Sequence, residues 1–389
     1  MTTHVFIVDS TTLKIHLEYM FAGTGAVDNV IDFNNSDTTT LSHPTENMLV
    51  SMIADASRIR AGDLIIFYLQ QNFSRKILDG KFFGVFRATQ DLSFLDNNDP
   101  SQYLRQELDK SLTFRILIEP YKVYPEGVSE WEALDDISHL QSPNQMLWSL
   151  IYRKLKGKRG NTMITIYESE RLFQLIRDKN SRRELNLNDS KLSFDEIEQK
   201  IITTSDPANK YTGRTEPINV FKRLISKYNA GLSFEAHLQA YIVQCLGRGL
   251  NKSLDDNLLI PGSDIVWLGN EVSCGVGMQR IDVMPLVEHN DQKILIPVEL
   301  KSVQADIINV NQIQRYIDWL EQYYKPNMQC DIQPVLIAKK ITDQTSARFT
   351  RVKNAFDKFN KKNAHRSHKL KYIDFVIDGN GLIFNEVSY

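Results

Sequence analysis

The order of helix-like and strand-like segments after residue 233 restricts the fold more than any other feature of the chain. Apolar residues recur at helical spacing in three stretches, at 233–247, 306–324 and 347–359. Short apolar runs that indicate strands lie between and after them, at 264–268, 280–287, 293–300, 332–338, 372–377 and 382–387. Elements in this order pack as helices on the faces of one sheet. The second half is therefore expected to be a mixed β-sheet flanked by helices.

The first half is dominated by strand patterns. Strands are predicted at 63–69, 81–87, 113–119 and 163–167, and helices at 44–60 and 144–155. Residues 184–232 are more polar, and a short helix is predicted at 193–202, where Ser193 and Glu196 have capping-box spacing.

The length of 389 residues also exceeds one ordinary domain, since domains run to about 100–200 residues. We therefore expect a two-domain protein of the α/β or α+β class. The predicted parts are a first domain at 1–183, a polar linker or small helical subdomain at 184–232, and a second domain at 233–389.

Composition excludes several classes of protein. With 42% hydrophobic and 24% charged residues, the chain is too apolar to be mostly disordered. Its longest unbroken apolar run, 64–69, is far shorter than the ~20 residues of a membrane span, and no signal peptide is indicated. Three widely spaced cysteines give no disulfide framework. We expect a cytoplasmic protein with no membrane partner.

Two basic segments lie in a chain whose net charge is only −2. Residues 153–183 carry ten bases against three acids, and residues 339–371 carry eleven against two. Clustered cations of this kind bind phosphate, although each run alone also fits a solvated helix face. The predicted DNA-backbone contacts are Arg153, Lys154, Lys156, Lys158, Arg159, Arg348, Arg351, Lys361 and Lys362.

Three charged residues form the sharpest candidate site. Glu299 and Lys301 share one face of a predicted strand. If that strand pairs with the one before it as a hairpin, Asp282 lies near Glu299. Two carboxylates so close repel unless a cation separates them, and hard oxygen ligands suit Mg²⁺, for which Mn²⁺ is expected to substitute. Lys301 would then act as a general acid or base, or as an electrostatic clamp. Alone, the pattern also fits a surface salt bridge.

Neighbouring segments supply further candidates for the same site. Glu235 lies on the preceding helix, and Gln312 and Tyr316 lie four residues apart on one face of the following helix. A nucleotide cofactor is not expected, because the phosphate-loop-like run 247–253 has Asn251 where a glycine is needed.

With these pieces in order, the second half resembles the PD-(D/E)XK nuclease superfamily, and within it the C-terminal domain of the NucS (EndoMS) endonucleases. The matching runs are Phe234-Glu-Ala-His-Leu238, Gln279-Arg-Ile-Asp282, Val298-Glu-Leu-Lys301 and Gln312-Ile-Gln-Arg-Tyr316. The resemblance implies a restriction-endonuclease-like fold in which Asp282 and Glu299 hold the metal and Lys301 is the catalytic lysine. Glu235, Gln312 and Tyr316 would support the site. Gln279 departs from the glycine that is usual before Arg-Ile-Asp.

The first half resembles PUA-like domains of the EVE kind, on the runs 59–68, 80–86, 112–118 and 142–148. This resemblance implies a β-barrel-like domain that holds one flipped, often modified base in an aromatic pocket. The candidate base-binding residues are Tyr68, Phe83, Trp131 and Trp148. Tyr68 and Phe83, in predicted strands, fit the hydrophobic core equally well.

Together these features predict a Mg²⁺-dependent endonuclease that acts on double-stranded DNA, with an N-terminal base-reading domain and a restriction role. A homodimer is expected because cutting both strands needs two active sites. Two alternatives stay open: a repair nuclease for mismatched or branched DNA, and a non-catalytic module that binds modified nucleic acid.

Overall fold

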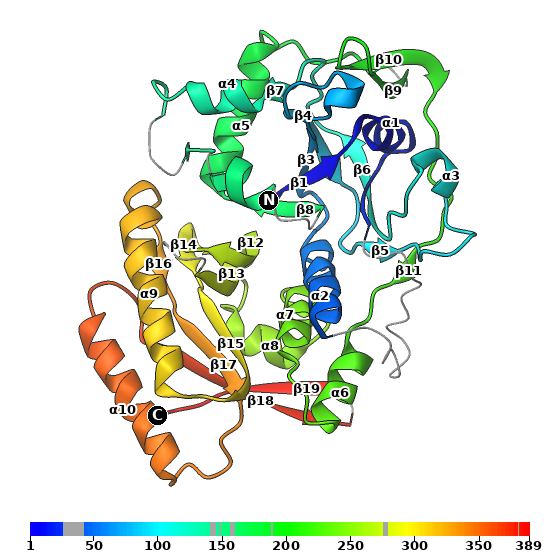
Figure 1. Ribbon diagram of the computed structural model, residues 1–389. Helices are drawn as coiled ribbons and strands as arrows, with labels where there is room; N and C mark the ends of the chain where they lie inside the picture. The colour runs from blue at the N-terminus through cyan, green and yellow to red at the C-terminus, as the bar shows by residue number, and fades with distance from the viewer. Residues whose placement is uncertain are drawn as a thin grey trace. The chain divides into compact units, whose positions relative to one another are not determined.

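The computed structural model describes residues 1–25, 43–140, 145–147, 149–155, 160–187, 190–274, 279–379 and 381–389. The chain forms two compact units (Figure 1): Met1–Asp32 with Asp55–Ile218, and Phe33–Ala54 with Asn219–Tyr389. Both contain mixed sheets and helices, which confirms a two-part chain that mixes helix and strand. The predicted linker 184–232 is divided between the units, whose boundary follows Ile218.

The first unit contains most of the N-terminal elements. They are β1 (Thr3–Val8), α1 (Ser10–Tyr19), β2 (Phe21–Thr24), β3 (Leu64–Leu69), η1 (Phe73–Arg75), β4 (Lys81–Ala88), β5 (Phe94–Leu95), α3 (Arg105–Leu108), β6 (Phe114–Pro120), β7 (Val128–Ser129), α4 (Glu130–Asp135), the π-helical η3 (Leu150–Lys154), β8 (Asn161–Ile164), α5 (Ile166–Lys179), β9 (Ser190–Asp195), β10 (Lys200–Pro207) and β11 (Glu216–Pro217). Their main sheet curls and has the order β11-β5-β6-β4-β3-β1-β8, with β2 beside β6 and β7 beside β4.

Both faces of this sheet are covered, which explains the unbroken apolar run in β3. Phe67 faces a core made with α1 and the β9–β10 hairpin, whereas Ile66 faces a core made with α5 and η3. Because successive strand residues point to opposite faces, a strand that is buried on both sides is apolar throughout.

Two predictions for this unit are wrong. Residues 193–202 form parts of the β9–β10 hairpin and not a helix, because Phe194 and Ile201 pack into the core of the unit. The strand predicted at 163–167 ends at Ile164, and Thr165 accepts a hydrogen bond from the Glu168 backbone N–H (3.2 Å) as the N-cap of α5.

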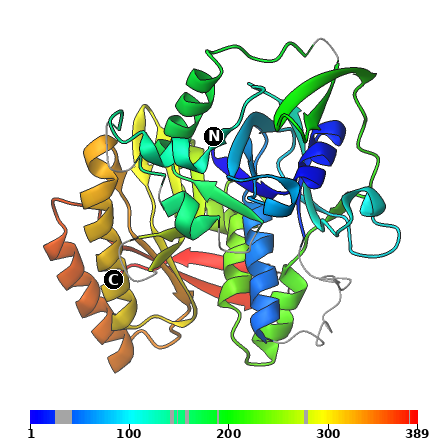
Figure 2. The same cartoon turned by 45° about the horizontal axis from the view of Figure 1, so that its top comes forward.

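The second unit contains the remaining elements. They are most of α2 (His43–Ser57), α6 (Phe221–Asn229), α7 (Glu235–Cys245), α8 (Lys252–Leu258), β12 (Asp264–Ser273), β13 (Arg280–His289), β14 (Gln292–Leu295), β15 (Val298–Gln304), α9 (Ile307–Tyr323), η4 (Lys325–Asn327), β16 (Asp331–Ile332), β17 (Val335–Lys339), α10 (Ala347–Lys362), β18 (Lys371–Asp378) and β19 (Gly381–Glu386). The sheet has the order β16-β14-β13-β15-β17-β18-β19, with β12 beside β13. Helices α9 and α10 lie on one side of it and α7 on the other (Figure 2), and α8 packs into the same core as α7.

The predicted strand 293–300 is two strands. Pro297 has no backbone N–H to donate, and the strand is interrupted there: β13 pairs with both β14 and β15, but the partner on the other side changes from β16 for β14 to β17 for β15. As a result Glu299 is the second and Lys301 the middle residue of β15, and neither lies at the end of a hairpin strand.

A buried ion network connects three helices of this unit. The Glu46 carboxylate on α2 accepts hydrogen bonds from Arg223 Nε (2.6 Å) and Lys227 Nζ (3.1 Å) on α6, and lies 3.0 Å from His237 Nε2 on α7. Burial alone would raise the pKa of Glu46, but the bonds from His237, Arg223 and Lys227 lower it well below its ordinary value. Burial lowers the pKa of His237.

In the described part of the chain, no helix combines the length and the apolar character that crossing a bilayer requires. Cys245, Cys274 and Cys330 are buried free thiols.

Candidate functional site

Two neighbouring strands of the second unit bring Asp282 and Glu299 together. Val283 of β13 pairs with Val298 of β15 in antiparallel register, which sets Asp282 beside Glu299. Asp282 Oδ2 accepts a hydrogen bond from the Leu300 backbone N–H at 2.7 Å. Asp282 and Glu299 therefore occupy opposite positions on adjacent strands, which are joined through β14 and not by a hairpin turn.

Glu299 is fully buried, with no exposed surface. Its Oε2 lies 2.5 Å from the Tyr316 hydroxyl, and its Oε1 lies 2.9 Å from Lys301 Nζ. Lys301 Nζ also donates to Glu235 Oε1 at 3.0 Å. Residues from β15, α7 and α9 thus surround one ammonium group and one buried carboxylate.

Charge repulsion and burial determine the protonation of the site. Burial and the neighbouring Glu299 raise the pKa of Asp282 well above its ordinary value, and burial also raises the pKa of Glu299. Burial would lower the pKa of Lys301, but the carboxylates of Glu299 and Glu235 outweigh it and raise that pKa. Lys301 is therefore a protonated ammonium at neutral pH, suited to hold negative charge.

The carboxylate pair fits a hard divalent cation. Among the described residues, no three or more His, Cys, Asp and Glu side chains are arranged to hold a metal ion. Asp282 and Glu299 are hard oxygen donors, and the buried Glu299 Oε1 lies 2.9 Å from the Lys301 ammonium. Mg²⁺ is commonly held by one or two carboxylates and completes its shell with water and phosphate oxygens. These two residues would hold it.

Helix α9 supports the buried carboxylate through Tyr316. The Tyr316 hydroxyl lies 2.8 Å from the Arg280 carbonyl oxygen as well as 2.5 Å from Glu299, so its one proton can bond either acceptor. Burial and Glu299 raise the pKa of Tyr316, which keeps the phenol protonated. Gln312 Nε2 donates to the same hydroxyl at 3.2 Å. Both α9 residues singled out in the sequence thus lie at the site.

Two supporting contacts were missed by sequence reasoning. Gln239 Nε2 donates to the Asp282 carbonyl oxygen at 2.7 Å, and the Leu300 N–H holds the Asp282 carboxylate. Gln239 lies four residues after Glu235 on α7, so helical spacing was a usable signal. The backbone contact of Leu300 has no sequence signal. Gln279, the departure from the family pattern, accepts a hydrogen bond from Arg315 Nε (3.1 Å).

Two of the base-binding candidates, Phe83 and Tyr68, lie in the core of the first unit, whereas Trp131 is exposed. Phe83 is fully buried and packs against Phe194 with ring centroids 5.5 Å apart. Tyr68 is 7% exposed and its hydroxyl donates to Glu130. Trp131 is 58% exposed and donates from Nε1 to Asp79 (2.9 Å). Trp148 lies outside the described residues.

The basic candidates are only partly described. Lys156, Lys158 and Arg159 lie outside the described residues, and Arg153 and Lys154 belong to η3. In the second basic segment, Arg348 lies 3.6 Å from Asp306 Oδ2. The other three, Arg351, Lys361 and Lys362, are exposed on α10.

Part of the second unit matches a known protein family. Residues 271–375 match the endonuclease NucS C-terminal domain. This match spans β13, β15 and α9, and indicates a nuclease of the NucS endonuclease type. No curated protein matches the chain. Among solved structures, Pyrococcus furiosus SfsA in complex with Ca²⁺ is 14% identical, covering 52% of this chain and 91% of that chain with a TM-score of 0.26. A likeness this distant carries no argument here.

Proposed function

We propose that this protein is a Mg²⁺-dependent endonuclease that hydrolyses phosphodiester bonds of double-stranded DNA at the Asp282–Glu299–Lys301 site. One observation carries the proposal: a buried and a half-buried carboxylate on adjacent strands, with an ammonium group 2.9 Å from the buried one, lie inside the segment that matches a nuclease domain. Such a pair is costly in a structural core, because buried like charges repel. A function in cation binding accounts for its presence.

The chemistry of each site residue suggests its role in the reaction. Mg²⁺, or Mn²⁺ in its place, would offset the negative charge that builds on phosphate oxygens during hydrolysis. Asp282 and Glu299 would hold the ion, and Tyr316 fixes the orientation of Glu299. The Lys301 ammonium, 3.0 Å from Glu235, orients the attacking water and the phosphate through its charge. Because its pKa is raised, Lys301 is already protonated and does not accept the proton of the water, which passes to solvent; Lys301 acts through its charge alone.

The proposed biological role is restriction. The first unit would act as a PUA-like base reader, with Trp131 as the most exposed of its described candidate aromatics (58%). The second would have the restriction-endonuclease-like fold, and a homodimer would cut both strands. The test is cleavage of matched plasmids with and without cytosine modification, with Asp282→Ala and Lys301→Ala as controls. We expect Mg²⁺-dependent cutting by the native protein alone. Undiminished cutting by both variants would refute the site.

Repair of mismatched or branched DNA is the second candidate, because the matching family domain is that of the endonuclease NucS. Faster cutting of mismatched than of matched duplexes would favour it over restriction. Binding of modified nucleic acid without Mg²⁺-dependent cleavage would favour a non-catalytic module.

Tyr316→Phe tests whether the Tyr316 hydroxyl supports Glu299 as a metal ligand. The variant keeps the buried ring but removes the hydroxyl 2.5 Å from Glu299. We expect the Mg²⁺ concentration for half-maximal cleavage to rise about tenfold or more, because contacts that orient metal ligands affect affinity by 10–100-fold. The maximal rate at saturating Mg²⁺ should change less. An unchanged Mg²⁺ requirement would show that Tyr316 has only a packing role.

A further inference from the structure

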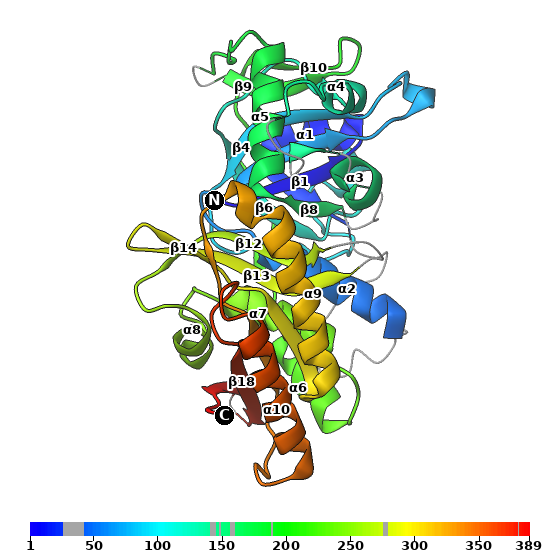
Figure 3. The same ribbon diagram turned by 90° about the vertical axis from the view of Figure 1, so that its left-hand side faces the viewer.

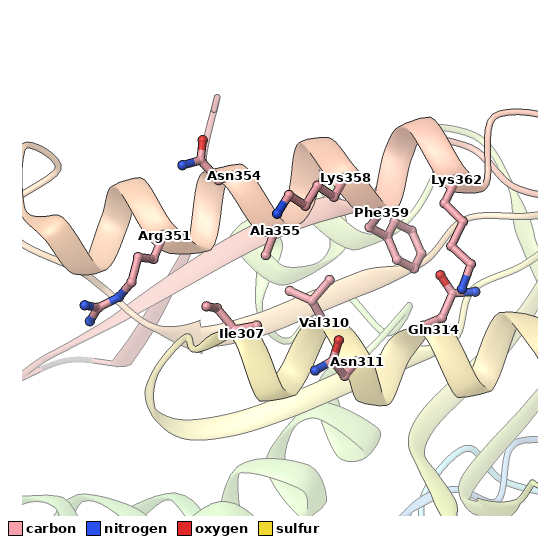
Figure 4. Close-up of a pocket in the computed structure, with 10 residues that line it drawn as sticks. All are labelled: Ile307, Val310, Asn311, Gln314, Arg351, Asn354, Ala355, Lys358, Phe359 and Lys362. Carbon is pink, nitrogen blue, oxygen red and sulfur yellow. The ribbon is translucent and has the colours of Figure 1, made fainter.

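A groove of about 410 Å³ runs between α9 and α10 (Figure 4). The α9 residues that line it do not include Gln312 and Tyr316, which face the candidate active site. Its floor is apolar: Val310 and Phe359 are buried, and Ile307 is 39% exposed. Figure 4 shows Ile307 and Val310 rising from α9 toward α10, with Phe359 reaching back toward α9. Figure 3 shows the two helices lying together in the second unit. The groove thus offers apolar contact as well as charge.

Three cations line the α10 side of this groove. Arg351, Lys358 and Lys362 are spaced seven and four residues apart, so they form one row along the helix. At ~1.5 Å rise per residue the row is roughly 16 Å long. That length suits a chain of phosphates better than one phosphate group.

In the described part of the chain, no partner neutralises these cations. Nearby Arg348 and Arg366 pair with Asp306 (3.6 Å) and Asp318 (2.7 Å). By contrast, among the described residues Arg351, Lys358 and Lys362 have neither an ion pair nor a hydrogen bond. Unpaired cations along a groove attract a polyanion from solution.

We propose that the α9–α10 groove binds a single-stranded nucleic-acid segment. The row of cations would follow its backbone, and an unpaired base would contact the apolar floor around Ile307. In a duplex the base faces are stacked inside and cannot reach such a floor, so the combination of charge and apolar surface favours an unpaired strand. The Asn311 and Asn354 amides at the rim can donate and accept hydrogen bonds at base edges.

The inference rests on the proposed function only in the choice of nucleic acid as ligand. Helix α9 presents Gln312 and Tyr316 to the candidate active site and Ile307 and Asn311 to the groove. The two sites are thus separated by about one helix diameter, ~10 Å. A nuclease built this way holds an unpaired strand beside the duplex it cuts.

The test measures binding without cleavage. A labelled short oligothymidylate is titrated with the full chain in EDTA, with Lys358→Glu against the matched control Lys353→Glu. Both lysines are exposed on α10, and Lys353 lies outside the groove. We expect Lys358→Glu to weaken binding about tenfold and Lys353→Glu less than about twofold, because only the first reverses a backbone contact. Equal effects of the two variants would overturn the proposal.

Three further arms define the ligand. Ile307→Ser should weaken oligothymidylate binding about threefold and leave an abasic strand of equal length unaffected, because it removes only apolar contact. The assignment would be overturned if Lys358→Glu weakened binding of a duplex as much as binding of the single strand. It would also be overturned if polyglutamate displaced the oligonucleotide as strongly as the unlabelled strand does. Because no arm requires Mg²⁺ or cleavage, failure of the groove and failure of the nuclease site are separate results.

Discussion

Replacing Asp282 by asparagine is expected to lower the rate of Mg²⁺-dependent DNA cleavage about a thousandfold, the size of effect that loss of one key electrostatic group produces. The change removes one of the two carboxylates that would hold the ion. Asparagine keeps an oxygen that can accept the Leu300 N–H bond of 2.7 Å. The loss should therefore reflect chemistry and not misfolding.

The fold of this variant should be intact for an electrostatic reason. The pKa of Asp282 is raised by burial and by Glu299, so its charge is unfavourable in the metal-free protein. Neutralising it removes a repulsion, and Lys301 keeps its contacts with Glu299 and Glu235. We expect the melting temperature in EDTA to be unchanged or higher. Glu288→Gln, on the same strand β13, is the matched control and should cut like the native protein. Cleavage by Asp282→Asn within about tenfold of the native rate would contradict the assignment.

Replacing Glu46 by glutamine is expected to lower the free energy of unfolding of the second unit by about 3–5 kcal/mol, the usual result when one member of a buried ion cluster is removed. The Glu46 carboxylate oxygens lie 2.6 Å from Arg223 Nε, 3.1 Å from Lys227 Nζ and 3.0 Å from His237 Nε2. Without its charge, two buried cations would face each other. Asp256→Asn, which breaks an exposed pair with Lys252 on α8, should change stability by less than about 1 kcal/mol.

The same network predicts the direction of acid denaturation. Hydrogen bonds from His237, Arg223 and Lys227 hold the pKa of Glu46 below its ordinary 4.5. Stability from this group is therefore complete above pH 4.5 and is lost as the pH falls toward the lower folded-state pKa. Urea unfolding of the full chain from pH 6 downward measures this, and Glu46→Gln should show a shallower decline than the native protein. A steeper decline would mean that other groups control the acid transition.

The parts of the fold that depend on local pattern could be predicted from the sequence. Helix α9 and the β18–β19 hairpin were predicted within about two residues, because apolar periodicity and the Gly-Asn-Gly turn determine them locally. The β9–β10 hairpin could not, since Phe194 takes its conformation from a core formed mostly by distant residues. The break at Pro297 was missed because the apolar run continues across it.

In the candidate site, too, some features follow from local sequence and others depend on packing between distant segments. Glu299 and Lys301 are two residues apart, so their shared face follows from strand geometry alone. The nearness of Glu235 to Lys301, 66 positions apart, follows from packing of α7 on the sheet. Partnerships such as Glu46 with His237 have no local sequence signal, because they join segments 191 residues apart.

The most direct test of the central claim is to locate the cation itself. Crystals of the native protein grown with Mn²⁺ would be measured for anomalous scattering, with Asp282→Asn crystals as the comparison. We expect a strong peak between the Asp282 and Glu299 carboxylates in the native protein and its loss in the variant. The account would be contradicted if native crystals at saturating Mn²⁺ showed no peak at this position while the protein still cleaved DNA.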